Sequence, residues 1–206
     1  SPLERTRHIR PHLMQGSTDK DKVDYVEETA ITDGMGNVAE GAAFAQTDVD
    51  LEQKVANVKK IGTYVTLSTE ILEDIPGLMS YVQGRLLAKY RQREDTQFLS
   101  GDGTGQNLSG LITDATAWAD PGADFTDTSA TNWDVLRHAV RQGTIAEYMT
   151  DKIFVNPTDI AKMDLEKDSQ NRYILPNIFS GADHRVSGVL VIPTTAIAAN
   201  TFLAGD

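Results

Sequence analysis

The chain contains no cysteine, and this absence excludes disulfide bonds, thiol catalysis and zinc sites with cysteine ligands. It also lacks any run of about 18 apolar residues, so no segment is predicted to cross a membrane as a helix. Motifs of nucleophilic catalysis and phosphate binding are absent too, because there is no Gly-x-Ser-x-Gly elbow and no P-loop with its Lys-Ser/Thr pair. The sequence therefore indicates a globular protein without a recognisable enzyme motif.

Basic residues are the scarcer charge, since 19 Lys and Arg against 30 Asp and Glu give a net charge of −11. Such a surface repels nucleic acid at long range, so a dedicated DNA-binding protein is not expected. The basic residues gather at residues 5–10 and 85–93, and the second group is interpreted as a solvated helix face with internal ion pairs. The histidines show no metal-ligand spacing, so neither a metal nor another cofactor is expected; they are His8, His12, His138 and His184.

Residues 68–105 contain the strongest helix signal. Ser68 and Thr69 are good N-cap residues and are followed by carboxylates, which predicts a short acidic helix with a break near Ile75. Pro76 fits only the first turn of a helix, so a second helix is predicted from Pro76 to about residue 99. Apolar side chains recur along it at steps of three and four and predict one apolar face, made of Met79, Val82, Leu86 and Tyr90.

The glycine-rich run at residues 101–105 (GDGTG) is predicted to end this helix. It resembles a phosphate-binding loop only superficially, since it follows a helix and lacks the Lys-Ser/Thr pair. The carboxylates before the helix, Glu70, Glu73 and Asp74, are interpreted as partners of the helix dipole. A general acid/base pair formed by two of them is the alternative interpretation.

Two extended segments predict a β-arm. Residues 23–26 have strand character, and apolar side chains of one parity continue along residues 49–67, with Val58 out of register as the mark of a bulge. Because isolated two-stranded arms are marginal in water, this arm is expected to need a partner surface. Residues 1–24 are polar, and an extended segment or a short helix around Ile9 is expected there without strong packing.

Helices and strands alternate after residue 130, which is typical of an α/β or α+β unit. Asn132 is the predicted cap of a helix over residues 133–148, and Asn156 with Pro157 predicts another helix start. The inward side chains of the first helix are predicted to be Leu136, Ala139, Val140 and Ile145. Strands are predicted at residues 152–155, 189–192 and 201–203.

The order and spacing of several segments carry a family resemblance. The strongest are residues 68–74, 80–86 and 99–111 (LSGDGTGQNLSGL). Weaker matches are residues 9–16, 25–28, 38–42, 56–59, 155–157, 159, 165–173 and 188–193. Over almost the whole chain, these residues resemble the major capsid proteins of tailed phages of the Hong Kong 97 type. No single motif is specific, whereas their order and spacing are.

This resemblance implies an α+β, Hong Kong 97-like capsid fold with a long spine helix, an extended β-hairpin loop and a mixed α/β axial domain. The implied domains are an N-terminal arm segment (residues 1–24), the extended loop (25–62), the peripheral domain with the spine helix (63–114) and the axial domain (115–206). The axial tip is expected within residues 164–184.

The implied function is that of a structural head protein, not an enzyme, whose copies assemble as pentamers and hexamers into an icosahedral shell around the genome of a tailed phage or prophage. The implied partners are further copies of the chain, with scaffold, protease and portal proteins, and DNA enclosed without specific recognition; no membrane is involved. The implied location is the virion capsid, and the host cytoplasm during assembly. The alternatives are an encapsulin-like cellular compartment and a carboxylate hydrolase using Glu70 and Glu73.

Inter-subunit contacts are expected at Phe44, Gln46, Arg85, Arg93, Asp168, Arg172 and Tyr173. Some relatives link subunits through a lysine of the extended loop. Phe44 stands at that position here, so the resemblance does not support covalent linkage, and packing of Phe44 on a neighbour is expected instead. The family pattern also continues past Asp206. The chain is therefore expected to be a fragment that forms no closed shell by itself and leaves the apolar face of its spine helix partly uncovered.

Overall fold

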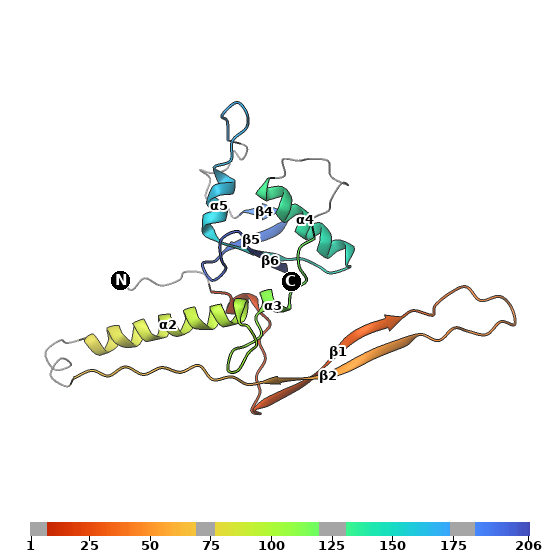
Figure 1. Cartoon of the computed structure of the whole chain (residues 1–206), viewed down its shortest axis with the longest axis horizontal. Helices are drawn as coiled ribbons and strands as arrows, with labels where there is room; N and C mark the ends of the chain where they lie inside the picture. Colours follow the sequence, from red (N-terminus) through yellow and green to blue (C-terminus); the bar gives the residue numbers. More distant parts are fainter. Residues whose placement is uncertain (1–7, 69–76, 120–130, 174–183) are drawn as a thin grey trace. The chain divides into compact units, whose positions relative to one another are not determined.

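The computed structural model of the chain describes residues 8–68, 77–119, 131–173 and 184–206 (Figure 1). The chain divides into two compact units, one of residues Met14–Lys60 and one of residues Ser1–Leu13 with Ile61–Asp206. Helices and strands are mixed, as predicted for the α+β class. Within the described ranges, no helix is both long enough and apolar enough to cross a membrane.

The smaller unit is built on two antiparallel strands, β1 (Lys22–Thr32) and β2 (Asp48–Asn57). The register shifts between Glu28 and Ala30, so the bulge lies in the first strand and the predicted bulge at Val58 is wrong. Val58 follows β2 and its amide donates to the Asp21 carbonyl, 3.0 Å away. Residues 58–68 form no strand, because β1 begins at Lys22 and offers nothing opposite them to pair with.

The long helix α2 (Leu78–Ser100) belongs to the larger unit. It begins two residues later than predicted, because Gly77 has φ = 87°, a left-handed conformation that a helix cannot include. The helix ends at the predicted glycine run, where the Gly101 amide donates to the Gln97 carbonyl. A Cβ at Gly101 would lie 2.1 Å from the Leu108 carbonyl oxygen, so this position needs glycine for the close return of the chain into α3 (Leu111–Asp114).

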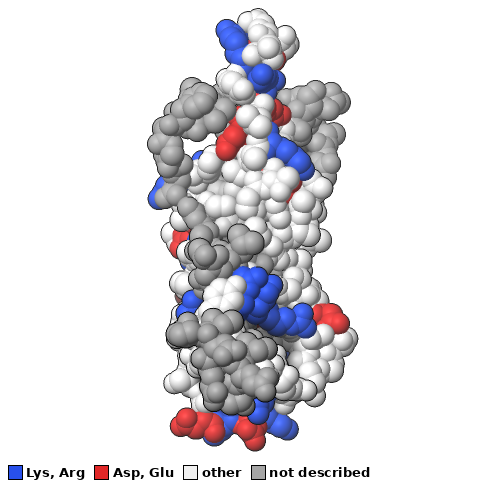
Figure 2. All heavy atoms as spheres, turned by 90° about the vertical axis from the view of Figure 1, so that its left-hand side faces the viewer, with Lys and Arg blue, Asp and Glu red and all other residues white. Residues whose placement is uncertain are grey.

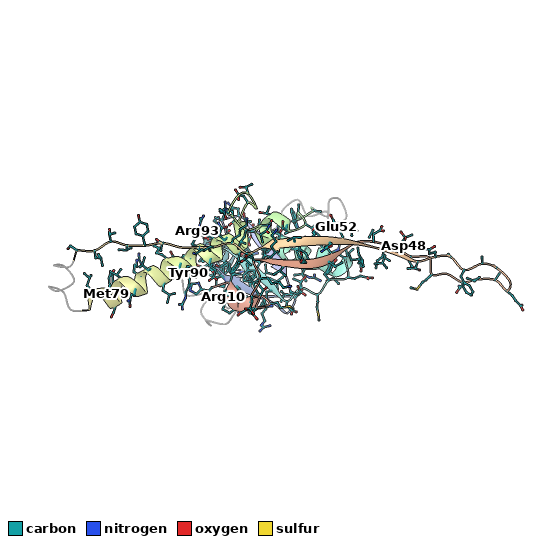
Figure 3. The ribbon with its side chains drawn as sticks, turned by 90° about the horizontal axis from the view of Figure 1, so that it is seen from below. Arg10, Asp48, Glu52, Met79, Tyr90 and Arg93 are labelled. Carbon is teal, nitrogen blue, oxygen red and sulfur yellow. The ribbon has the colours of Figure 1, made fainter. Side chains whose placement is uncertain are left out.

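The buried face of α2 is not the predicted apolar face. Its buried apolar residues, Ala88 and Leu99, lie on one side together with the buried Asp95. At about 100° per residue, that side is about half a turn from the side of Met79 and Tyr90. Met79 and Tyr90 are 49% and 39% exposed (Figure 3), whereas Val82 and Leu86 are half-buried, so the predicted apolar face is not the side that packs in the core.

A four-stranded sheet with the order β4-β5-β3-β6 lies at the centre of the larger unit. Its strands are β3 (Lys152–Val155), β4 (Arg185–Val186), β5 (Val189–Pro193) and β6 (Phe202–Gly205). β5 pairs with β3 in parallel, and β6 pairs with β3 antiparallel. The buried strands at residues 152–155 and 189–192 are therefore confirmed, and the last strand is shifted by one residue at its start.

Both faces of this sheet are covered, because successive side chains of a strand point to opposite sides. Ile153 and Val155 pack in a cluster with side chains of α4 (Asn132–Ile145) and α5 (Pro157–Asp164). Phe154, between them in sequence, packs in a second cluster with Ile9 and Leu99. The second cluster thus joins the end of α2 and the N-terminal segment to the sheet.

The N-terminal segment packs closely, so the prediction of weak packing around Ile9 was wrong. Ile9 is fully buried and precedes a short 3-10 helix, η1 (Arg10–His12). Its backbone amide donates to Oδ1 of Asp95 at 3.1 Å, and Nδ1 of His8 lies 2.8 Å from Oδ2 of the same carboxylate. One buried carboxylate of α2 therefore holds the segment in place.

Helix α4 is capped by Thr131, not by the predicted Asn132. Thr131 and Asp134 form a capping box, in which each side chain accepts a hydrogen bond from the backbone amide of the other residue. The amide and hydroxyl of Thr131 lower the pKa of Asp134. Of the predicted inward side chains, Leu136, Ala139 and Val140 are buried, whereas Ile145 at the end of the helix is 65% exposed.

Replacing Thr131 by alanine is expected to lower the free energy of unfolding by about 1 kcal/mol, because the first turn of α4 loses its cap. Chemical denaturation measures this change. Asn132→Ala is the control, and it is expected to stay within about 0.5 kcal/mol of the wild-type protein, as surface substitutions usually do. A larger loss for Asn132→Ala than for Thr131→Ala would contradict the assignment of the cap.

Helix α5 starts as predicted, with Asn156 as its cap and Pro157 in the first position. Asp159 in its first turn is buried and joins the helix to the turn before β6. Burial alone would raise the pKa of Asp159, but hydrogen bonds from the Lys162 ammonium (2.9 Å) and the Asn200 amide (2.6 Å) lower it below its ordinary value.

Asp159 is expected to make stability depend on pH. Because its pKa is lower in the folded protein, its stabilising effect is complete above the ordinary aspartate pKa of about 3.9 and is lost as the pH falls through the lowered value. The thermal midpoints of wild type and Asp159→Asn should therefore converge between about pH 6 and about pH 3. Asp151→Asn, at an exposed position, is the control. A constant difference across this range would contradict the linkage.

Candidate assembly surfaces

Large apolar side chains remain exposed on both units, and they define the candidate functional surfaces of this chain. They occur on the arm of β1 and β2, along α2 and around a groove beside β6. On the described part of the face drawn in Figure 2, uncharged side chains predominate, and basic and acidic side chains lie beside each other in small groups. No cluster of metal-ligating side chains occurs among the residues that the structure describes.

Phe44 and Gln46 lie in the segment that connects the two strands of the arm. Phe44 is 87% exposed, which makes it one of the most exposed large apolar side chains described. The backbone carbonyl of Gln46 lies against Gly34, where a Cβ would come within 2.3 Å of it, so the two sides of the segment touch there. The Gly34 amide also donates to Thr47 Oγ1 at 3.2 Å. This contact fixes the base of the segment and leaves Phe44 outside it.

The predicted contact residues Arg85 and Arg93 both lie on α2, and Arg93 is two residues before the buried Asp95. Arg93 is exposed and Arg85 is half-buried. Figure 3 shows Arg93 near Tyr90 on the long helix. Between Leu78 and Arg93 the helix contains four basic residues and no acidic residue, so this part of the helix carries a net positive charge.

Asp168 and Arg172 bind each other and close a turn. The carboxylate of Asp168 accepts hydrogen bonds from the backbone amides of Gln170 and Arg172 and from Nε of Arg172, each at 2.9 Å. The amide of Arg172 is the main reason why the pKa of Asp168 is lowered, and its guanidinium adds to the effect. Tyr173 is 43% exposed, with the Lys167 ammonium 4.8 Å from its ring centre. Asp168 therefore shapes this loop, and Tyr173 is its exposed apolar surface.

A contact that the sequence pattern did not reveal joins the end of α5 to the residue before β4. Nε2 of His184, just before β4, lies 2.7 Å from Oδ1 of Asp164 at the end of α5. The His184 ring also stacks on Trp133 of α4, with ring centres 5.9 Å apart. The two partners are 20 residues apart, so no local spacing could have predicted the pair.

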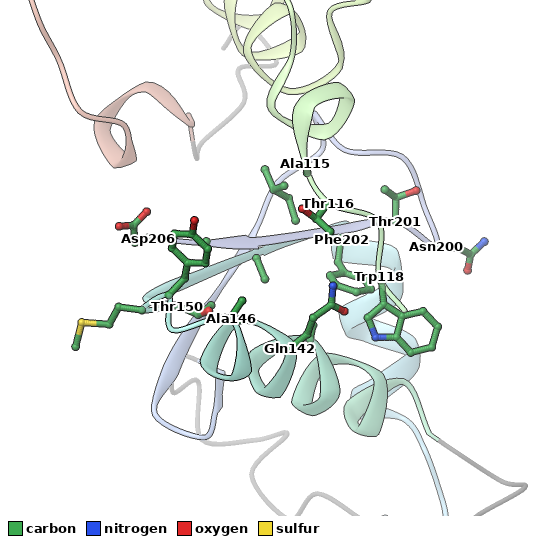
Figure 4. A pocket seen from close by; sticks show the side chains of 17 residues that line it. Ala115, Thr116, Trp118, Gln142, Ala146, Thr150, Asn200, Thr201, Phe202 and Asp206 are labelled. Atoms are coloured by element: carbon green, nitrogen blue, oxygen red, sulfur yellow. The ribbon is translucent and has the colours of Figure 1, made fainter. Parts of the chain in front are cut away.

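A groove of about 520 Å³ lies between α4 and β6 (Figure 4). Ala139 and Gly143 of α4 and Ala146 just after it form part of its wall, and Phe202 of β6 lies opposite. The Gln142 side chain binds the backbone of Ala117 and Ala119 and so holds the neighbouring segment at the groove. The sequence analysis had not identified this groove.

Among the described residues, the glycine run and the N-terminal histidines that the sequence singled out have local structural roles. Glu70, Glu73 and Asp74 lie outside the described residues. The glycine run folds as a turn in which Asp102 accepts hydrogen bonds from Asn107 and Thr104, which lower its pKa. His8 contacts Asp95, and His12 lies edge-on to Phe154 with ring centres 5.8 Å apart.

Known proteins of similar sequence and fold identify the family of this chain. The sequence pattern that defines the phage capsid family matches residues 1–206. The chain belongs to the phage capsid family. A curated member, the major capsid protein of Enterobacteria phage HK97, is 36% identical over 204 residues, which are 99% of this chain and 52% of that protein. The chain thus spans about half the length of this relative. The family is one of structural proteins and not a class of enzymes.

Solved capsids of low sequence identity have the same fold as this phage capsid family member. The capsid of an empty GTA particle has a TM-score of 0.70 at 20% identity, with 97% of this chain and 70% of that chain covered. A chain from Microbacterium phage Oxtober96 has a TM-score of 0.68 at 14% identity, with 100% and 72% covered. The predicted Hong Kong 97-like fold is confirmed. The relatives found are capsid proteins and lend no support to the encapsulin-like or hydrolase alternatives.

Proposed function

We propose that this protein is the shell-forming subunit of a tailed-phage or prophage head, and that its copies assemble as pentamers and hexamers around the genome. The observation that supports this most directly is the exposed arm, whose strands carry apolar side chains that a monomer leaves in water. A two-stranded arm of this kind gains stability when a partner covers it. Membership of the phage capsid family makes other copies of the chain the natural partner.

We assign the domains by the same reasoning. Residues 1–24 are proposed as the N-terminal arm segment, 25–62 as the extended loop, 63–114 as the peripheral domain with α2 as the spine helix, and 115–206 as the axial domain. The compact unit Met14–Lys60 is close to the proposed loop but starts earlier, and β1 also begins before residue 25, at Lys22. The turn closed by Asp168 and Arg172 lies in the proposed axial tip, and Tyr173 is proposed as a contact there.

The proposed partners follow from assembly around DNA. The acidic net charge of −11 is compatible with a shell that encloses DNA without binding it tightly. Scaffold, protease and portal proteins are proposed as assembly partners, with the host cytoplasm as the place of assembly and the virion capsid as the final location. No membrane partner and no catalytic role are proposed.

Negative-stain electron microscopy of the full-length gene product tests the proposal. Closed, regular particles are expected. A product that remains a monodisperse monomer at every concentration and salt condition tested would contradict the shell function. Genes for a portal and a protease beside this gene are expected if the shell belongs to a phage, whereas a cargo enzyme gene would favour the encapsulin-like alternative.

Phe44 is expected to act by packing on a neighbouring subunit and not by forming a covalent link. Phe44→Ala and Phe44→Lys should both lower the denaturant concentration at which assembled particles dissociate, because an 87% exposed aromatic side chain would lose its cover. Light scattering during denaturation measures this change. Met35→Ala, at another exposed position of the arm, is the control. Unchanged dissociation for both Phe44 variants would show that Phe44 does not pack in the shell.

A further inference from the structure

The turn that follows α4 is a Schellman motif with a glutamate at its glycine position. The Glu147 amide donates to the Thr144 carbonyl at 3.1 Å. The Tyr148 amide donates to the Gly143 carbonyl at 3.0 Å, and these two bonds define the motif. Glu147 has φ = 64°, a left-handed conformation that strains a residue with a side chain and that glycine usually occupies in this motif. Its carboxylate also follows the C-terminal end of a helix, where the helix dipole disfavours negative charge, so local stability gives no reason for a glutamate here.

The same turn exposes three large apolar side chains. A Schellman motif often includes a contact between the residue at the position of Tyr148 and the residue at the position of Gly143. Because Gly143 has no side chain, this contact does not form, and Tyr148 is 76% exposed. Ile145 and Met149 beside it are 65% and 79% exposed. We call residues 145–149 the apolar turn.

A second exposed surface lies in the loop that follows α5. Leu165 is 57% exposed and Tyr173 is 43% exposed. The Lys167 ammonium lies 4.8 Å from the centre of the Tyr173 ring, so a positive charge accompanies the aromatic side chain. Hydrogen bonds to the Asp168 carboxylate close the loop and fix its shape. We call residues 165–173 the α5 loop.

The two surfaces lie at opposite ends of α4. The apolar turn includes Ile145, the last residue of α4. The α5 loop follows the end of α5, and that end contacts the beginning of α4, where Nε1 of Trp133 donates to the Met163 carbonyl at 3.3 Å. From Trp133 to Ile145 the helix rises about 18 Å. The two surfaces of one chain therefore do not cover each other.

The two surfaces carry opposite charges. Glu147 and Lys167 are both exposed. Within the part of the chain that the structure describes, neither of them forms an ion pair. One surface thus combines apolar side chains with a carboxylate, and the other combines apolar side chains with an ammonium. Two surfaces of this kind are complementary both in charge and in apolar character.

We propose that the apolar turn of one copy docks on the α5 loop of a second copy, with Glu147 paired to Lys167 and the exposed apolar side chains in contact. This inference rests on the proposed shell function and names two surfaces that join neighbouring copies. Because each copy has the two different surfaces at opposite ends of α4, the contact is head to tail and gives a ring when its rotation closes. Contact with the neighbour then offsets the strain at Glu147.

Cross-linking tests the contact in the 206-residue chain, which contains no cysteine of its own. Met149→Cys and Ser169→Cys place one thiol on each surface and keep both charges. A short bismaleimide is expected to join copies of this double variant into a ladder of oligomers. Arg137→Cys in place of Met149→Cys is the control, because Arg137 is exposed on α4 about two turns before the apolar turn. The control pair should give about tenfold fewer oligomers.

Charge reversal identifies the side chains that meet. In the Met149→Cys/Ser169→Cys chain, Glu147→Lys and Lys167→Glu should each lower the yield of oligomers about tenfold, because like charges then face each other. The two reversals together should restore the yield to within about twofold, since the ion pair is only inverted. Gel electrophoresis under denaturing conditions measures the yield.

Glycine variants separate the contact from local stability. Glu147→Gly should raise the thermal midpoint of the chain by about 2–4 °C, because the strain is relieved, and should still lower the yield of oligomers. Ser187→Gly is the matched control. Ser187 also has a left-handed φ, of 51°, but it lies in the turn between β4 and β5, outside both surfaces. It should raise the midpoint and leave the yield of oligomers unchanged.

The contact and the shell function can fail separately. Equal yields for the two cysteine pairs, or a combined reversal that restores nothing, would overturn the contact. An unchanged yield in Glu147→Gly would overturn the role of Glu147. Closed particles of the full-length product without cross-linking between positions 149 and 169 would sustain the shell function alone, and cross-linked oligomers without any closed particle would sustain the contact alone.

Discussion

Replacing Leu99 by alanine is expected to lower the free energy of unfolding by about 2–5 kcal/mol. Leu99 is fully buried in the cluster that contains Ile9, Phe154 and Ile192. It is the apolar side chain by which the end of α2 packs on the sheet, so its truncation leaves a cavity between three separate parts of the chain. Urea denaturation followed by circular dichroism measures the change.

Met79→Ala is the matched control on the same helix. Met79 is 49% exposed and lies half a turn from the buried side of α2. The free energy of unfolding of Met79→Ala is therefore expected to stay within about 0.5 kcal/mol of wild type. Equal losses for Leu99→Ala and Met79→Ala would mean that both sides of α2 are covered within one chain. That result would contradict the exposure of Met79.

Replacing Asp95 by alanine is expected to cost about 1–3 kcal/mol, because the buried amide of Ile9 then loses its acceptor. The Asp95 side chain is 1% exposed and accepts hydrogen bonds from Ile9 and from His8. The same denaturation experiment measures the loss. Limited proteolysis should also cut the N-terminal segment of the variant sooner, because the carboxylate holds that segment on α2.

Glu94→Ala is the control for this second variant. Glu94 is the neighbour of Asp95 and forms an ion pair with Arg10 at 3.6 Å, with side chains that are 13% and 59% exposed, respectively. Because the Arg10 end of this pair is open to solvent, the pair is expected to contribute about 1 kcal/mol or less. If Asp95→Ala is no more destabilising than Glu94→Ala, the buried carboxylate does not hold the N-terminal segment.

Locally encoded features of the fold were predicted from the sequence. The start of α5 was predicted correctly, because Asn156 and Pro157 act on the amides of their own turn. The buried strands β3 and β5 were also predicted correctly, because a strand that is covered on both faces appears in the sequence as a short continuous apolar run. The end of α2 was also predicted, since the glycine run from residue 101 ends it.

Features that depend on distant contacts were not predicted. Ile9 looked like part of a polar segment, and only its burial against Leu99 and Phe154 makes it core. The contact between His184 and Asp164 was likewise not predicted. The cap of α4 was predicted one residue too late, at Asn132 instead of Thr131. The candidate contacts Asp168 and Arg172 were chosen by resemblance, but in the structure they bind each other and shape their own loop.

The sequence by itself determined the family, the helix α2 and the existence of an apolar arm, because periodicity and motif order are properties of the chain alone. Only the tertiary structure decided which sides of these elements are free. The position of one bulge selects which side chains of β1 share a face, and the packing of Ala88 and Leu99 selects the buried side of α2. A helix or strand has the same local pattern whichever partner covers it, so its free surface is known only once the core is formed.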